Sequence, residues 1–276
     1  MDYPGAQHLE LTEGCIASCT FCPHSQMNRN PKARMDEALF RRIIDEAATW
    51  PVAPRILPFM TSEPFQNKRL VEQLLYVNER LPASEITFFT IGALFTEALL
   101  ERLESVRNIA AVFLSLHHYD PLLYNTETGL NHEQTLRSID RFLRWNEAKQ
   151  VVREVTLLRV SDGNQDHDRA FHEFCGRRFP SVRVVCSWRW NWKGDIASYM
   201  DVESTLNHVC GRHQTFHVLA DGRSALCCLD QKGEHGYGDV NTETILSLYN
   251  SSRARFLRTH TKRDGGTPCD GCSMQG

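Results

Sequence analysis

The sequence predicts an α/β fold, a partial (β/α)6 barrel of the TIM type followed by a small C-terminal domain. Short apolar runs alternate with amphipathic helical runs over the first two thirds of the chain, which is typical of a parallel sheet with crossover helices. After Trp188 the texture changes to short runs separated by Gly, Asp and Asn. We therefore expect a barrel domain over residues 1–194 and a second domain over residues 195–276.

Six apolar runs are expected to be the strands of the barrel, because each has the length and apolar content of a buried strand. In chain order they cover residues 8–12, 55–60, 86–90, 110–116, 151–160 and 182–187. Chemistry in such barrels gathers on the loops that follow the C-terminal ends of the strands. The loops after these runs are therefore the places to look for a site.

A helix is expected after each of the first five strands, because apolar residues recur there at helical spacing. The five ranges are 36–48, 67–80, 96–104, 131–147 and 166–178, and a further helical stretch lies near 245–258. In the first helix Leu39, Ile43 and Ala47 fall on one face. Asp36 stands at its start, where a carboxylate can cap the free N–H groups.

Composition and charge describe an ordinary globular protein. Of 276 residues 41% are hydrophobic and 24% charged, and the formal net charge of -3 favours neither a nucleic-acid surface nor a polybasic membrane contact. No apolar run approaches the roughly 20 residues that span a bilayer. The first residues carry acidic side chains and cysteines and do not resemble a signal peptide. We expect a cytoplasmic protein.

Ten cysteines in a chain without an export signal indicate metal ligands rather than disulfides. Three stand near the start, and five of the other seven lie between Cys210 and Cys272. The remaining pair, Cys175 and Cys186, are expected to be buried small hydrophobes.

The first group is Cys15, Cys19 and Cys22, hereafter the cysteine triplet, with Phe21 directly before the last cysteine. Three thiolates on one loop can hold three irons of a [4Fe-4S] cluster and leave the fourth iron free for a small molecule. The alternative is zinc, which usually takes four ligands, often from paired C-x2-C segments. His24 could be a fourth ligand, but so close to Cys22 it would crowd the site.

The C-x3-C-x2-C spacing with its aromatic residue resembles the signature of the radical S-adenosylmethionine (SAM) superfamily. The resemblance implies reductive cleavage of SAM at the open iron, giving methionine and a 5'-deoxyadenosyl radical that abstracts hydrogen from a substrate. It also implies that Phe21 lies near the adenine and that a flavodoxin or ferredoxin supplies the electron.

Thr61, Ser62, Glu63 and Pro64 follow the second strand, where the superfamily usually shows Gly-Gly-Glu-Pro. The resemblance implies that this segment binds the methionyl ammonium of SAM through backbone carbonyls and Glu63. Two glycines are replaced here, so the local backbone can differ. The alternative is an ordinary Glu-Pro turn.

Three further residues at strand ends are candidates by the same resemblance. Thr90 begins Thr-Ile-Gly, which resembles a Thr-Asn-Gly of relatives, and Ser115 stands where a polar residue meets the ribose or carboxylate of SAM. His117 follows at the barrel mouth, where it could contact substrate or donate protons. The ordinary alternative for each is a turn, surface or core hydrogen bond.

A second group of cysteines occupies the tail: Cys210, Cys227, Cys269 and Cys272, hereafter the auxiliary cysteines. Four thiolates can close around a [4Fe-4S] cluster or form a zinc knuckle. The C-x11-G-x4-C run with a late C-x2-C resembles the Twitch subtype of the SPASM/Twitch extension, which implies one auxiliary [4Fe-4S] cluster and so two clusters in all. Neighbouring side chains on a strand point apart, and the glycine spacing favours Cys227 over Cys228.

The size and layout resemble the 2-deoxy-scyllo-inosamine dehydrogenases of aminoglycoside biosynthesis. That implies an oxidoreductase of natural-product biosynthesis that takes hydrogen from a carbinol carbon of a small molecule, with net oxidation assisted by the auxiliary cluster. A basic residue after the sixth strand would deprotonate the substrate, and the candidates are Arg189 and Lys193. Trp190 and Trp192 could stack on a ring-shaped substrate.

Two alternatives stay open. One is a radical SAM peptide maturase that crosslinks, epimerises or oxidises a ribosomal precursor, although a barrel starting by His8 leaves no room for a leader-binding domain. The other is a non-catalytic scaffold that binds zinc at both cysteine groups.

Overall fold

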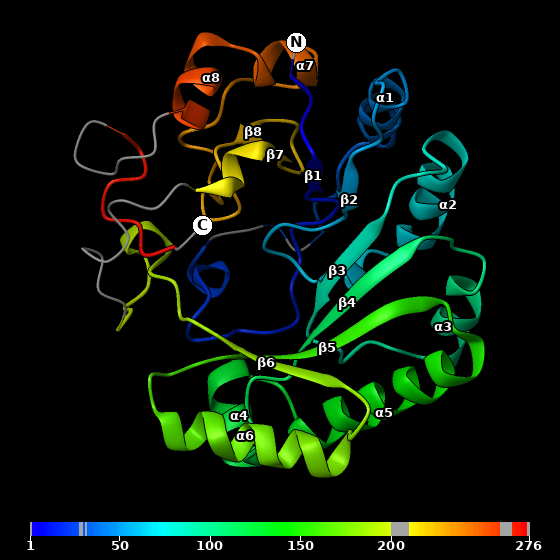
Figure 1. Cartoon of the computed structure of the whole chain (residues 1–276), viewed down its shortest axis with the longest axis vertical. Coiled ribbons are helices and arrows are strands. Elements are labelled where there is room, and N and C mark those ends of the chain that lie inside the picture. The colour runs from blue at the N-terminus through cyan, green and yellow to red at the C-terminus, as the bar shows by residue number, and fades with distance from the viewer. Residues whose placement is uncertain (1, 28–29, 31, 200–209, 260–266, 275–276) are drawn as a thin grey trace.

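The computed structural model describes residues 2–27, 30, 32–199, 210–259 and 267–274 of the chain. Its strands form one curved sheet in the order β6-β5-β4-β3-β2-β1-β7-β8, with helices packed along its outer side (Figure 1). Neighbours from β6 to β7 are parallel, and only the β7 and β8 pair is antiparallel. The predicted α/β barrel-type fold is confirmed.

The six predicted strands are all present in this sheet. They are β1 (Ala6–Leu9), β2 (Arg55–Leu57), β3 (Ile86–Thr90), β4 (Ile109–Ser115), β5 (Val152–Val160) and β6 (Arg183–Ser187). Because all six are parallel, their C-terminal ends meet at one edge of the sheet, where the loops after them converge.

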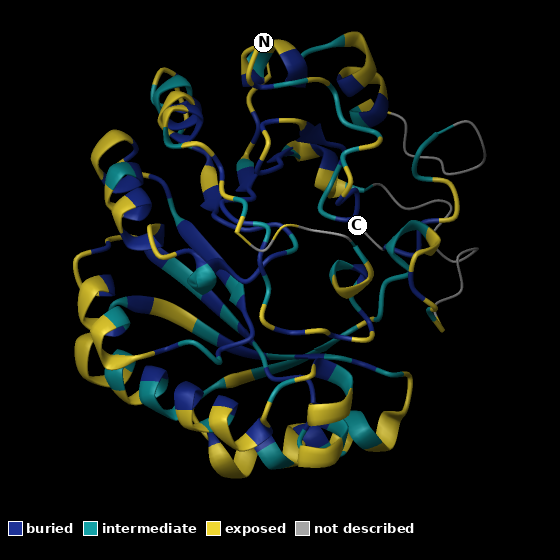
Figure 2. Ribbon diagram, turned by 180° about the vertical axis from the view of Figure 1, so that it is seen from behind, coloured by how far each residue is buried: buried dark blue, intermediate teal, exposed yellow. Residues whose placement is uncertain are grey.

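The helices that cross over between these strands are amphipathic. They are α1 (Glu37–Ala47), α2 (Leu70–Arg80), α3 (Glu97–Leu103), α4 (Pro121–Thr128), α5 (His132–Lys149) and α6 (Gln165–Arg178). In α1 the Asp36 carboxylate accepts the N–H groups of Ala38 and Leu39, as the capping argument predicted. The outward faces of the crossover helices are exposed, and their faces toward the sheet are buried (Figure 2). This burial of apolar side chains holds the sheet in place.

Helix α4 was not predicted. Its start carries Asp120, whose carboxylate accepts the N–H of Leu123, and Pro121 in the first turn, and Gly129 ends it with a φ of 70°. These start and stop signals are legible in the sequence, but the helix is short and its apolar face is weak. Its importance is positional, because it supports the loop that carries the cysteine triplet.

The first strand was predicted too far along the chain. β1 ends at Leu9, and the side chain of the next residue, Glu10, accepts hydrogen bonds from the loop after β2. The backbone N–H of Glu10 still donates to the carbonyl of Val218, the residue paired with Leu9 in the neighbouring strand.

The tail joins the sheet rather than packing beside it. β7 (Thr215–Val218) pairs in parallel with β1, from Ala6 opposite Thr215 to Leu9 opposite Val218, and β8 (Ser224–Ala225) extends the edge. The single helix expected near 245–258 is two helices, α7 (Ile245–Tyr249) and α8 (Ser252–Thr259). The division at residues 194 and 195 stays a prediction.

Within the described residues, none of the helices has both the length and the apolar character needed to cross a membrane.

Candidate functional site

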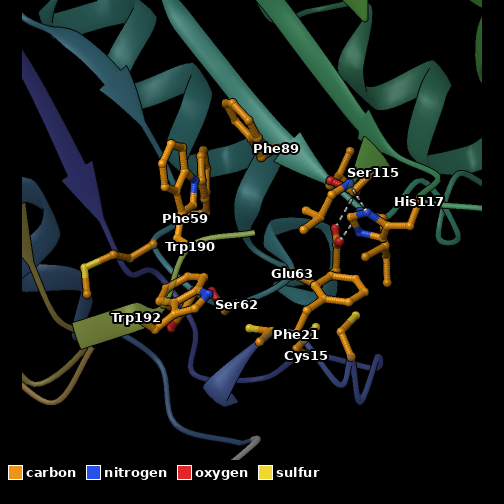
Figure 3. Close-up of a pocket in the computed structure, with 17 residues that line it drawn as sticks. Cys15, Phe21, Phe59, Ser62, Glu63, Phe89, Ser115, His117, Trp190 and Trp192 are labelled. Carbon is orange, nitrogen blue, oxygen red and sulfur yellow. Dashed lines mark hydrogen bonds between the residues drawn. The ribbon is translucent and has the colours of Figure 1, made fainter. Parts of the chain in front are cut away.

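A cavity of about 220 Å³ opens where the strand-end loops converge. Figure 3 shows the side chains of the cysteine loop, of the loops after β2, β3 and β4, and of the segment after β6 turned toward one space. The lining residues are Cys15, Cys19, Phe21, Cys22, Phe59, Met60, Thr61, Ser62, Glu63, Phe89, Thr90, Ile91, Ser115, His117, Val160, Trp190 and Trp192. The cavity therefore gathers every candidate for SAM binding that the sequence suggested.

The loop that carries the cysteine triplet is hydrogen-bonded to the C-terminal end of α4. The N–H of Ser18 donates to the carbonyl of Thr128, and the N–H of Thr20 donates to the carbonyl of Glu127, each at 2.9 Å. A Cβ added at Gly129 would lie 2.2 Å from Ser18 Oγ, so only glycine allows this close approach. The C-terminal end of α4 thus holds the cysteine loop at one wall of the cavity.

The three thiols of the triplet suit a positively charged group that takes thiolate ligands. Burial raises the pKa of Cys15 to about 12, and burial together with the neighbouring Cys22 raises the pKa of Cys19 well above its usual value. Each thiolate would repel the next, so the three can ionise together only around a cation. An iron-sulfur cluster supplies that charge and accepts three such ligands.

Glu63 is a buried carboxyl group at the centre of the site. Its oxygens accept hydrogen bonds from Thr90 Oγ1 at 2.7 Å, Ile91 N–H at 2.9 Å and Phe65 N–H at 3.1 Å. Burial nevertheless raises the pKa of Glu63 to about 7, because these bonds offset only part of the desolvation. A carboxylate offers about four acceptor positions, so one remains for a bound cation.

The loop before Glu63 is held by a second carboxylate, which sequence reasoning missed. Glu10 is fully buried and accepts the N–H groups of Thr61 and Ser62, both at 3.0 Å. A charged residue inside an otherwise apolar run was the signal that could have revealed it. The N–H of Glu63 donates to the carbonyl of Gly14 at 3.0 Å, which ties this loop to the cysteine loop.

Ser62 has a buried hydroxyl group that is unpaired within the described residues. Its Oγ is buried and finds no hydrogen-bond partner among the described residues. Buried hydroxyl groups are nearly always paired, so this one fits a polar group of a bound molecule. The residues present here, Ser62, Glu63 and Thr90, suit the ammonium and hydroxyl groups of SAM.

Phe21 and His117 line the cavity, and Arg189 packs on the Phe21 ring. The His117 ring meets the Phe21 ring edge-on, with centroids 4.6 Å apart, and the Arg189 guanidinium carbon lies 5.4 Å from the Phe21 centroid. Arg189 Nη2 lies 3.6 Å from Glu127 Oε1, and its buried Nε and Nη2 make no hydrogen bond to the described residues. Arg189 is not among the residues that line the cavity.

His117 is held as a neutral hydrogen-bond donor. The N–H of Val160 donates to His117 Nδ1 at 3.3 Å, so the ring proton of the neutral form sits on Nε2. Burial lowers the pKa of His117 to about 3, which keeps the ring neutral at ordinary pH. The residue has a φ of 61°, a left-handed conformation held by the strand-end contacts on either side.

A buried ion network supports this wall from outside. Arg159 is fully buried and donates to Asp168, Asp162 and the carbonyl of His117 at 2.7, 2.8 and 2.6 Å. Removing one member of such a network leaves a buried charge unpaired. The stability lost in this way exceeds the stability that the intact network adds. It fixes the ends of β4 and β5, from which Ser115 and His117 reach the cavity.

The segment after β6 divides its side chains between two regions. Trp190 and Trp192 line the main cavity, whereas Lys193 lines a separate polar cavity, with its Nζ 3.9 Å from Asp230 Oδ1. Of the three predicted catalytic residues, His117 lines the main cavity, Arg189 contacts the lining residue Phe21, and Lys193 lies in the other cavity.

Of the auxiliary cysteines, Cys227 and Cys272 gather beside the two tryptophans, although among the described residues no group of three or more His, Cys, Asp or Glu side chains is placed to hold a metal ion. Cys272 packs with Leu229 and Met274, and Cys227, Cys228, Trp190 and Trp192 contact that cluster. Burial raises the pKa of Cys227, and the neighbouring thiols of Cys228, Cys272 and Cys210 raise it further. Cys269 Sγ lies 3.6 Å from His213 Nε2. These thiols, of which Cys272 is buried and the others are half-buried, also suit a cationic cluster, and both Cys227 and Cys228 lie beside them.

Comparison with known families agrees with both cysteine sites. The family model described as the radical SAM superfamily matches residues 9–159, and the model described as an iron-sulfur cluster-binding SPASM domain matches residues 210–273. The cysteine triplet lies within the first match and the auxiliary cysteines within the second.

A curated relative is the S-adenosyl-L-methionine-dependent 2-deoxy-scyllo-inosamine dehydrogenase of Niallia circulans, 27% identical over 95 residues. The aligned part spans 34% of this chain and only 38% of that protein.

Solved structures share the fold over nearly the whole chain. BtrN in complex with AdoMet and 2-DOIA gives a TM-score of 0.63 at 15% identity, covering 99% of this chain and 95% of BtrN. SuiB of Streptococcus suis, bound to the precursor peptide SuiA, gives 0.72 at 15% identity, covering 99% of this chain and 70% of SuiB.

Proposed function

Because the chain belongs to the radical SAM superfamily, we propose that it oxidises a small polyhydroxylated or aminocyclitol-like molecule by hydrogen abstraction, with its tail holding one auxiliary [4Fe-4S] cluster. One observation carries the proposal. A single cavity has the cysteine triplet and Glu63 at one wall and, at another, Trp190 and Trp192, which also contact the auxiliary cysteine region. A substrate in that cavity would lie between the two cluster sites.

Two cofactors are implied by this proposal. The triplet would hold a [4Fe-4S] cluster whose open iron binds SAM, and the bound pair supplies a 5'-deoxyadenosyl radical. Glu63 would bind the methionyl ammonium, and Ser62 and Thr90 would bind polar groups of SAM, as would Ser115. Phe21 would lie against the adenine, since it is the aromatic residue next to the last ligand.

The remaining lining favours a ring with hydroxyl groups. Phe59, Phe89, Trp190 and Trp192 present apolar faces to the cavity, and such faces stack on the C–H surfaces of a small ring. His117 would donate from Nε2–H to a substrate oxygen. Arg189 packs on Phe21 and would reach a substrate only after its side chain moved, and its guanidinium stays protonated and cannot act as a base.

Lys193 stays a prediction as the base. Its ammonium faces Asp230 in the neighbouring cavity, so deprotonating a substrate would require the segment after β6 to turn. Solvent at the open mouth is an alternative acceptor of the hydroxyl proton.

The experiment uses candidate substrates deuterated at a carbinol carbon. The anaerobically reconstituted protein is incubated with SAM, a flavodoxin or ferredoxin system and a panel of aminocyclitols, amino sugars and nucleosides. We expect deuterium in 5'-deoxyadenosine and a ketone product with at least one of them. Deuterium transfer from none of them, together with turnover of a peptide, would refute the small-molecule assignment.

A peptide maturase is the second candidate, because the fold is shared with SuiB bound to its precursor peptide. A synthetic peptide with side-chain deuterium, tested in the same assay, distinguishes the two. The likeness in layout to BtrN, of which the chain covers 95%, is the reason that we prefer the small molecule.

A further inference from the structure

Asn191 stands between the two tryptophans of the cavity and is bonded to the segment that carries the last two cysteines. Its backbone N–H donates to Ser273 Oγ at 2.7 Å, and its Nδ2 donates to the carbonyl of Gly271 at 2.6 Å. Its Oδ1 accepts the N–H of Ser273 at 3.1 Å. Three bonds therefore join residues about eighty positions apart, on both sides of Cys272.

The backbone at this point is strained and needs support. Trp192 and Lys193 have φ values of 48° and 60°, in the left-handed region that side chains other than glycine rarely occupy. Asn191 also organises this turn locally. Its Oδ1 accepts the N–H of Lys193 at 3.3 Å and its carbonyl accepts the N–H of Gly194 at 2.8 Å. Such a conformation persists only where surrounding contacts determine it.

The hydrogen bonds of Asn191 bear on the cavity because both of its neighbours in sequence line it. Trp190 and Trp192 both line the cavity, and both contact the buried cluster formed by Leu229, Cys272 and Met274. A shift of the Cys272 segment would therefore move the tryptophan wall, because the two share one set of contacts and three hydrogen bonds.

We propose that Asn191 is a positioning residue that makes the shape of the substrate cavity depend on the occupancy of the auxiliary site. Ligation of Cys269 and Cys272 fixes their segment, Asn191 transmits that fixed position to the turn, and the two tryptophans are held as the cavity wall. With the auxiliary site empty, the Cys272 segment and the wall loosen together. This rests on the proposed function for the auxiliary cysteines.

Limited trypsin digestion tests the coupling without an activity assay. Arg189 and Lys193 flank the wall, and cleavage after them requires this segment to open. For the reconstituted wild type we expect slow cleavage at both sites. For Asn191→Ala with the same iron content, and for the Cys269→Ala/Cys272→Ala variant, we expect cleavage at least about fivefold faster, since local opening sets the rate.

Two further variants serve as comparisons. Ser273→Ala removes one side-chain acceptor and should give an intermediate rate. Glu133→Gln, which removes one partner of an exposed ion pair on α5, should leave the two cleavages unchanged. Circular dichroism checks that each variant is folded.

The outcomes separate the two claims. Full iron loading with Asn191→Ala cut as slowly as wild type would overturn the coupling and leave the proposed function standing. Loading of only about four irons in the wild type, half of the about eight expected for two clusters, would overturn both.

Discussion

The carboxylate of Glu10 accepts the backbone N–H of Ser62 at 3.0 Å, across 52 positions of sequence. With the matching bond from Thr61 N–H at 3.0 Å, this buried group shapes the loop that leads into Glu63. The end of β1 thus sets two features of the site at once, the loop after β2 and the cysteine loop that begins a few residues later. Contacts of this kind make the site sensitive to changes outside the residues that line it.

Replacing Glu10 should disturb the site and the fold together. Glu10→Ala leaves one buried and one half-buried backbone N–H group unpaired, which should lower the free energy of unfolding by about 2–4 kcal/mol. We expect SAM binding to weaken by about tenfold or more, since an unshaped loop must be ordered on binding. Denaturant titration and equilibrium dialysis measure the two effects. Glu101→Gln, on the exposed face of α3, should change neither, and a normal SAM affinity in Glu10→Ala would count against the positioning role.

SAM binding should strengthen as the pH rises toward neutrality. Burial raises the pKa of Glu63 to about 7, so below that pH the group is protonated in the free protein and must lose its proton to bind an ammonium. We expect the affinity to fall by up to about tenfold per unit between pH 6.5 and 5.5. Glu63→Gln should bind weakly with a flat profile over this range. A wild-type affinity that does not change with pH would contradict the assignment of Glu63 to the ammonium.

The same carboxyl group has an effect on stability with a defined sign. Its pKa in the folded protein lies above its ordinary value of 4.5, so the folded state holds more protons than the unfolded state between those two values. The contribution of Glu63 to the free energy of unfolding should therefore fall as the pH rises from about 4.5 to 7 and then level off. Comparing wild type with Glu63→Gln by denaturant titration across that range isolates the effect.

Asp230 should be required for the auxiliary site. Its carboxylate accepts the N–H groups of Leu226, Glu234 and His235 at 3.0 to 3.1 Å, which folds the loop around Cys227 and Cys228. Asp230→Ala should therefore lose about half of the bound iron, the share of one of two clusters. Asp221→Ala, in an exposed turn of the same region, is the matched control. Iron and sulfide analysis decides, and full loading of Asp230→Ala would be the contrary result.

Cys227 and Cys228 form a matched pair for assigning the fourth thiol. We expect Cys227→Ala to lose the auxiliary iron and Cys228→Ala to keep it, because the spacing from Gly222 favours Cys227. Both side chains are half-buried near Cys210 and Cys272, so burial alone does not choose between them. The reverse pattern of iron content would assign Cys228 instead.

Much of the barrel could be predicted because each of its parts has a local signal. The strands and crossover helices follow from apolar periodicity, and the loops after β1, β2, β3 and β4 each carry residues that line one cavity. Parallel strands bring their C-terminal ends together, so residues at the ends of separate runs could be grouped from the sequence alone.

The missed features lack a local signal. β7 is four residues long and gains its partner, β1, from more than two hundred positions away, so no window of sequence reveals the pairing. The bonds between Asn191 and Ser273 also join distant parts of the chain. Lys193 looked like a neighbour of Arg189, but the left-handed turn at Trp192 and Lys193 sends its side chain to another cavity.

The most direct test of the central claim is the formation of 5'-deoxyadenosine. The protein is reconstituted with iron and sulfide without oxygen, reduced with dithionite and given SAM. We predict 5'-deoxyadenosine and methionine from the wild type, and none from the Cys15→Ala/Cys19→Ala/Cys22→Ala variant, which should still hold about four of about eight irons. A fully loaded wild type that forms no 5'-deoxyadenosine under these conditions, or a triple variant that still forms it, would contradict the account.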